Sequence, residues 1–194
     1  MLTEYQQAME KYRQRVFSFA YYSLRARADA EDVTQEVFIR LWQHWRSIDQ
    51  SRIGAWLMRV SHNAVIDLVR HRKSRWESVE LLDDQLSDDQ EPALDLETLQ
   101  LRRVLEEAIG ELDDPYRSIL IMRDIQGLSY QEIRQCLDLS ESQVKVYLHR
   151  ARRKLRENEA LRRVAGNAAA KAGSVASKES QPQQLRTHTG HRHV

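Results

Sequence analysis

The sequence predicts an all-α protein made of two small helical domains joined by an acidic linker. Residues that break helices are scarce, with 6 Gly and 3 Pro in 194 residues. Apolar residues recur every three or four positions along most of the chain, which is the spacing of one helical face. Charge falls into three blocks: +4 over residues 59–75, −9 over 76–101 and +5 over 140–156. An acidic block therefore separates two basic regions, each suited to a polyanion.

Composition excludes several classes of protein. No apolar run approaches the roughly 18–20 residues needed to cross a bilayer, and the N-terminus is polar, so we expect neither membrane insertion nor a secretory signal. A single cysteine, Cys136, fits a reducing compartment, and we expect a cytoplasmic protein. The sequence shows no phosphate loop, metal-ligand spacing or nucleophile constellation, so we expect no enzyme, cofactor or metal. The terminal His188, His191 and His193 are expected to be part of an ordinary tail.

Two helices are predicted at the start of the chain, over residues 4–24 and from Asp29 onward. Asp29 is the predicted N-cap of the second helix. That helix has a wide apolar arc, made of Val33, Val37, Leu41, Phe38, Trp42 and Trp45. Part of such an arc packs inward, and part either closes the core or forms an exposed patch for a protein partner.

A third helix is predicted after a loop at residues 46–52. Its inward stripe is formed by Ile53, Leu57, Val60, Ala64 and Leu68. Asn63 and Asp67 lie four residues apart, so they share a face, and that face leads into a basic end. One interpretation is a base-reading face with a phosphate-contacting end, and the other is a solvated face.

The acidic stretch over residues 77–97 contains Pro92 and is predicted to be a linker. Helical spacing resumes over residues 94–112. The next helix has Asp114 as its predicted cap, Pro115 at its first position and Gly127 as its stop. Residues 94–157 are therefore expected to form a compact four-helix module.

A helix-turn-helix is predicted over residues 128–155. Ser129 with Glu132, and Ser140 with Gln143, each form a capping box, so each pair marks the start of a helix. Asp138 tolerates the left-handed conformation that the turn between them needs. The apolar stripe of the second helix is Val144, Leu148, Ala151 and Leu155. The alternative is a helical hairpin with a solvated face, but six bases against one acid over residues 140–156 favour nucleic acid.

With these motifs in this order, residues 5–158 resemble a bacterial extracytoplasmic-function (ECF) sigma factor. The resemblance implies a region 2-like domain over 1–75, an acidic linker over 76–93 and a region 4-like helix-turn-helix domain over 94–160, followed by a disordered tail over 161–194. It implies an alternative sigma factor that binds core RNA polymerase, through its largest-subunit clamp helices and its flap, and directs promoter recognition, promoter opening and initiation. A stand-alone helix-turn-helix regulator is the alternative function. An anti-sigma factor is a further implied partner.

The resemblance also implies site residues. Polymerase contacts are implied for Asp32, Gln35, Glu36, Arg40, Leu41 and Trp42, because residues 29–42 are similar to the family's docking helix. Contacts to the minus-ten element are implied for Asn63, Asp67, Arg70, Arg72 and Lys73. Contacts to the minus-thirty-five element are implied for Ser142, Gln143, Lys145, Val146, His149, Arg150 and Arg153. The chain departs from the family pattern at Ile53, usually an aromatic residue, at Gly54, usually polar, and at Asp138, often glycine.

Overall fold

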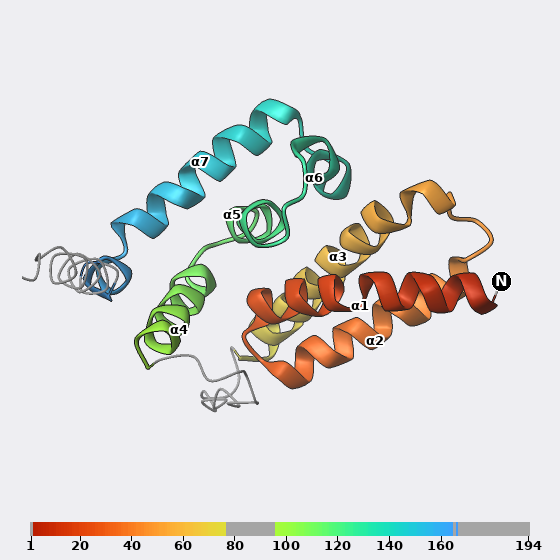
Figure 1. The fold of residues 1–194 in the computed structure, drawn as a ribbon, viewed down its shortest axis with the longest axis horizontal. Coiled ribbons are helices and arrows are strands. Elements are labelled where there is room, and N and C mark those ends of the chain that lie inside the picture. The colour runs from red at the N-terminus through yellow and green to blue at the C-terminus, as the bar shows by residue number, and fades with distance from the viewer. Residues whose placement is uncertain (1, 77–95, 165, 167–194) are drawn as a thin grey trace, which may run out of the picture.

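The computed structural model describes residues 2–76, 96–164 and 166, and in these residues it contains helices and no strand (Figure 1). The first part holds α1 (Leu2–Leu24), α2 (Arg27–His44), a 3-10 turn (Gln50–Arg52) and α3 (Ile53–Trp76). The second holds α4 (Leu96–Gly110), α5 (Tyr116–Leu120), a π-helical turn (Ile121–Ile125), α6 (Tyr130–Leu137) and α7 (Glu141–Glu157). A further short helical segment covers residues 159–164. The predicted all-α class is confirmed, while the predicted acidic linker and terminal tail lie largely outside the described residues.

The first three helices pack side by side around one apolar core. α1 and α2 run antiparallel, and α3 lies across both (Figure 1). Phe19, Leu41 and Leu57, one from each helix, are completely buried. Ile53, where the family usually has an aromatic residue, is also part of this core. At Gly54 a Cβ atom would lie 3.1 Å from the Tyr12 ring, so the absence of a side chain lets α3 begin close to α1.

In the second part, α5, α6 and α7 pack around apolar residues that continue the core of the first part. Ile119, Met122, Ile133 and Val144 are completely buried there. Helix α4 instead packs on α1 of the first part, which differs from the predicted four-helix module.

The two parts pack against each other, a feature that the sequence did not predict. α6 lies on α3, and the π-helical turn contacts α1. Buried apolar residues of both parts form one continuous cluster, and polar side chains add hydrogen bonds across the contact. The guanidinium of Arg117 donates to the carbonyls of Leu112 (2.8 Å) and Gly110 (2.7 Å) and, across the interface, to that of Ser23 (3.0 Å). It thereby joins the carboxyl end of α1 to that of α4, where helix dipoles favour a cation.

Two of the predicted helix caps are wrong. α2 begins at Arg27, and Asp29 lies in its first turn, where its carboxylate accepts from Arg72 of α3. α5 begins at Tyr116, so Asp114 lies before the helix and accepts from Ser118 and from His62 of α3, the latter at 3.1 Å. In both cases the carboxylate that we predicted to cap a helix binds a side chain distant in sequence instead.

Candidate nucleic-acid interface

The helix-turn-helix forms as its capping boxes predict. The Ser129 hydroxyl accepts from the Glu132 backbone N–H (3.2 Å), and the Glu132 carboxylate accepts from the Ser129 N–H (2.7 Å). Hydrogen bonds to the Glu132 carboxylate from the side chain and the backbone N–H of Ser129 lower the pKa of Glu132. Asp138 ends α6 with φ 54°, in the left-handed region, so the chain turns sharply into α7.

Helix α7 presents its predicted contact residues to solvent. Val144, Leu148 and Ala151 are buried against α5 and α6. The opposite face is exposed throughout and consists of Ser142, Gln143, Lys145, Val146, His149, Arg150 and Arg153. The basic face is therefore available in the packed molecule.

The cations of α7 differ in how they are held. Glu141 accepts from Lys145 at 2.6 Å and raises the pKa of that amine, and Glu157 lies 3.4 Å from Arg153. Arg152 makes a two-point contact with Asp124 at 2.9 and 2.5 Å, so it anchors α7 to the preceding turn. Within the described parts of the chain, Arg150 has no ion pair. Among the described residues, a phosphate that binds Arg150 would thus break no ion pair, whereas one that binds Lys145 or Arg153 would compete with a glutamate.

Gln143 performs two tasks. Its side-chain oxygen accepts from the Ser140 backbone N–H and hydroxyl, both at 2.8 Å. A bidentate contact to adenine needs both the carbonyl oxygen and the amide NH₂ group of a glutamine side chain. With the oxygen engaged by the cap, only the amide NH₂ group of Gln143 is left to face a base.

On α3 the predicted minus-ten residues do not all share one face. Asn63, Asp67 and Arg70 are exposed and lie within an arc of about 60° at 100° per residue. Arg72 lies about half a turn around the helix from Asn63 and pairs with Asp29 of α2. This corrects the prediction that placed Arg72 on the same contact face. Lys73 lies in α3, but its side chain is outside the described part of the structure.

The predicted polymerase-contacting residues of α2 are exposed or partly exposed, with one exception. Leu41 is completely buried in the core, so it packs the domain and cannot touch a partner. Trp45 also closes the core, whereas Trp42 is 43% exposed and lies edge-on to Tyr5, with ring centroids 5.0 Å apart. Most of the apolar arc of α2 therefore fills the core, and Trp42 is its exposed aromatic residue.

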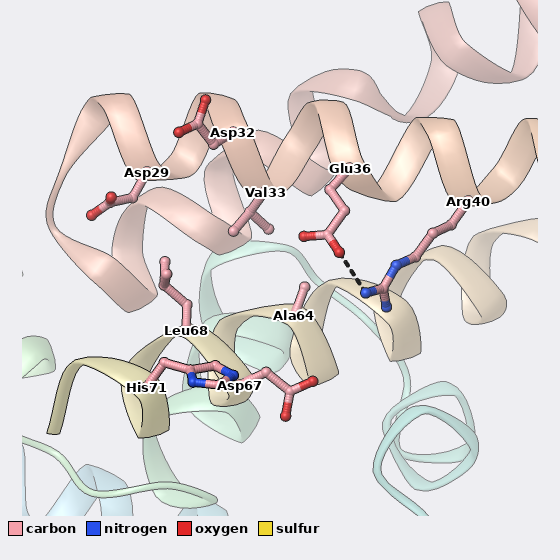
Figure 2. Close-up of a pocket in the computed structure, with 9 residues that line it drawn as sticks. All are labelled: Asp29, Asp32, Val33, Glu36, Arg40, Ala64, Asp67, Leu68 and His71. Atoms are coloured by element: carbon pink, nitrogen blue, oxygen red, sulfur yellow. Dashed lines mark hydrogen bonds and ion pairs between the residues drawn. The ribbon is translucent and has the colours of Figure 1, made fainter. Parts of the chain in front are cut away.

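A groove of about 330 Å³ lies between α2 and α3 (Figure 2). It is lined by Asp29, Asp32, Val33, Glu36, Arg40, Ala64, Asp67, Leu68 and His71. Figure 2 shows Glu36 and Arg40 paired with each other on α2, across the groove from Asp67. The structure thus brings predicted polymerase-contacting residues and a predicted minus-ten residue to one groove. Its lining holds four carboxylates against the single guanidinium of Arg40, which disfavours a phosphate inside it.

Sequence reasoning missed the polar side chains that join the two parts. Arg59 donates to the Gln135 carbonyl at 2.5 Å, and Gln126 donates to the Arg15 carbonyl at 2.8 Å. The sequence shows that Arg59 shares a helical face with Asn63, four residues later, but no local pattern indicates its contact with Gln135, 76 residues away.

Comparisons with known proteins decide the family. The model described as Sigma-70 region 2 matches residues 8–75, and that described as Sigma-70, region 4 matches residues 102–155. The chain is 36% identical over 129 residues to the ECF RNA polymerase sigma factor SigM of Bacillus subtilis, covering 66% of this chain and 77% of SigM. The chain belongs to the ECF sigma factor family. It is also 30% identical over 158 residues to SigE of Mycolicibacterium smegmatis, covering 80% of this chain and 62% of SigE.

Solved structures share the fold of this ECF sigma factor. The sigma factor RpoE of Bartonella quintana, in complex with the anti-sigma factor NepR, matches with a TM-score of 0.66 and 22% identity, over 78% of this chain and 94% of RpoE. CnrH, in complex with the cytosolic domain of CnrY, matches with a TM-score of 0.58 and 27% identity, over 79% of this chain and 85% of CnrH.

Membership confirms the function that the sequence predicted. An ECF sigma factor is an alternative initiation factor that directs RNA polymerase to promoters, and sigma factors are known as non-catalytic subunits. The alternative function, a stand-alone helix-turn-helix regulator, is not favoured. Among the described residues, no helix is long and apolar enough to span a membrane.

Proposed function

We propose a division of labour among three helices of this sigma factor. The exposed side of α2 docks on core polymerase through Asp32, Gln35, Glu36, Arg40 and Trp42. The stripe of α3 containing Asn63, Asp67 and Arg70, together with Lys73, contacts the minus-ten element, and the outward face of α7 contacts the minus-thirty-five element. We keep the domain bounds predicted from sequence, 1–75 and 94–160, as part of this proposal, although α4 of the second domain packs on α1 of the first. The protein has no catalytic role of its own and acts in the cytoplasm.

The observation that carries this proposal is the presentation of α7. Two capping boxes and a left-handed Asp138 fix its direction, and every predicted contact residue faces solvent. Cations on such a face position a protein on the DNA backbone, and the side chains between them contact base edges.

Transcription reconstituted with core polymerase tests the division. Arg150→Ala should weaken promoter binding and lower the slope of log affinity against log salt by about 1, while binding to core polymerase is unchanged. Asp32→Ala combined with Trp42→Ala should weaken polymerase binding and leave the exposed face of α7 intact. Arg103→Ala, which removes an exposed cation of α4 paired with Glu107, is the matched control.

Two results would contradict the proposal. If both test variants lost only DNA binding, α2 would not be the docking surface. If the natural chain bound promoter DNA without ever binding core polymerase, the stand-alone regulator would be the better description.

We also propose an anti-sigma partner, because the solved structure of RpoE, which shares the fold, is a complex with the anti-sigma factor NepR. Such a partner should inhibit reconstituted transcription when added in equimolar amount.

A further inference from the structure

Arg152 of α7 lies at the edge of the face that we assign to DNA. It follows Lys145 by seven residues, so the two are about 20° apart round the helix. Its guanidinium donates from Nε to one carboxylate oxygen of Asp124 at 2.9 Å and from Nη2 to the other at 2.5 Å. The side chains of Arg152 and Asp124 are 45% and 34% exposed. An exposed ion pair contributes little to stability, but a two-point contact fixes the orientation of both groups.

The carboxylate that Arg152 binds is itself held firmly. Asp124 belongs to the π-helical turn Ile121–Ile125, a kind of element that is rare and often found at functional sites. Ile121 and Met122 of this turn are completely buried. The Met122 carbonyl accepts from the Leu128 backbone N–H at 2.9 Å, which closes the turn before α6 begins. Asp124 is therefore a fixed point, relative to the core, against which α7 is aligned.

Other contacts of α7 constrain its rotation about its own axis less strictly. Val144, Leu148 and Ala151 decide which side of the helix is buried, but apolar burial is not directional. On the opposite flank, Lys154 lies 3.6 Å from Asp113, whose side chain is 82% exposed. Of these two ion pairs, which join α7 to earlier elements among the described residues, only that of Arg152 is a two-point contact.

A small rotation of α7 would affect base contacts more than phosphate contacts. The side chains of a helix lie within about 5–6 Å of its axis, so a rotation of roughly 10–20° moves them by about 1–2 Å. Hydrogen bonds to base edges require donor–acceptor distances of about 2.7–3.2 Å and are broken by such a movement. A flexible lysine or arginine can still reach a phosphate, which positions the protein without carrying sequence information.

We propose that Arg152 is a positioning residue that determines base specificity: by binding Asp124 it fixes the rotation of α7, and it does not itself contact DNA. The side chains of the exposed face, such as Gln143 and Val146, then meet the base edges in one orientation. The inference rests on the proposed function, because that function assigns α7 to the minus-thirty-five element.

Fluorescence anisotropy with the full chain, core polymerase and labelled promoter DNA tests the inference. The promoter is one located by mapping transcript starts, and further fragments carry single base-pair changes in its minus-thirty-five element. One wrong base pair should weaken binding of the natural chain about 5- to 140-fold. Arg152→Ala should lower this ratio at least about threefold and leave the slope of log affinity against log salt unchanged.

Three variants separate orientation from charge. Arg152→Lys keeps the charge but cannot make the two-point contact, so it should lose discrimination as Arg152→Ala does. Lys154→Ala removes the same charge from the opposite flank of α7 and should leave the ratio unchanged. Asp124→Ala should lower the ratio as Arg152→Ala does, and combining these two changes should lower it no further, because both break one contact.

Several results would overturn the inference. A salt slope lowered by about 1 in Arg152→Ala would show that Arg152 contacts phosphate directly. Undiminished discrimination in Arg152→Ala or Arg152→Lys, or a further loss in the double variant, would show that the ion pair does not set the rotation of α7. Partial unfolding cannot imitate the expected result, because it weakens binding to every sequence alike. If the natural chain itself did not discriminate at the minus-thirty-five element, the proposed function of α7 would fail instead.

Discussion

Ser140→Ala probes how the recognition helix is built. The Ser140 hydroxyl accepts from the Gln143 backbone N–H at 3.2 Å, and the Gln143 side chain accepts from the Ser140 N–H at 2.8 Å. Removing an N-cap serine costs about 0.5–2 kcal/mol of stability, typically about 1 kcal/mol. The lost hydrogen bond lies in the first turn of α7, so Ser142 and Gln143 should become less ordered at the end that faces DNA.

If that disorder must be reversed on binding, a loss of about 1 kcal/mol corresponds to a roughly fivefold weaker promoter complex. Ser129→Ala is the matched control, because it removes the equivalent cap of α6, where the Glu132 N–H to Ser129 hydroxyl distance is also 3.2 Å. Urea unfolding should show similar losses for both variants. Fluorescence anisotropy with core polymerase and labelled promoter DNA should show weaker binding for Ser140→Ala alone. Equal promoter affinity of the two variants would refute the reasoning.

Two further predictions concern stability. Leu41→Ala should cost about 2–5 kcal/mol in urea unfolding because Leu41 is completely buried, whereas Trp42→Ala should cost clearly less; the reverse order would contradict the burial. Burial opposes ionisation of Asp114, but hydrogen bonds from His62 and Ser118 outweigh it and lower its pKa, so its stabilising effect is complete above the unfolded pKa near 3.9 and is lost as pH falls below it. Urea midpoints measured from pH 5 to 3 should therefore fall more steeply for the natural chain than for Asp114→Asn.

Features encoded by neighbouring residues were predictable from sequence. The two capping boxes, the left-handed Asp138 and the buried stripe of α7 each depend on residues a few positions apart. The all-α class follows from the same short-range spacing. The direction and the exposed face of the recognition helix therefore follow from local sequence alone.

Features that depend on distant partners were not predictable in this way. Asp29 is a residue type typical of a helix cap, but its carboxylate instead accepts a hydrogen bond from Arg72, 43 residues later. Arg72 lies half a turn from Asn63 by helix periodicity, on the side of α3 that faces Asp29. The hydrogen bonds between the two parts of the molecule join long polar side chains to backbone carbonyls, and such pairs leave no periodic signal in the sequence. The apolar stripes show which residues are buried, but not that the two parts share one core. Leu41 was misassigned because docking residues and core residues alternate along α2.

The double use of Gln143 limits how this sigma factor could be re-targeted to other promoters. A library that randomises the DNA-facing positions of α7 would also change the residue that starts the helix. Substitutions at position 143 would change the stability of α7 and the base preference at the same time. A selection for promoter specificity could then not separate the two effects. Restricting position 143 to Gln and Glu, the residues that complete such a cap, would let specificity vary at Lys145, Val146 and His149 on an intact helix.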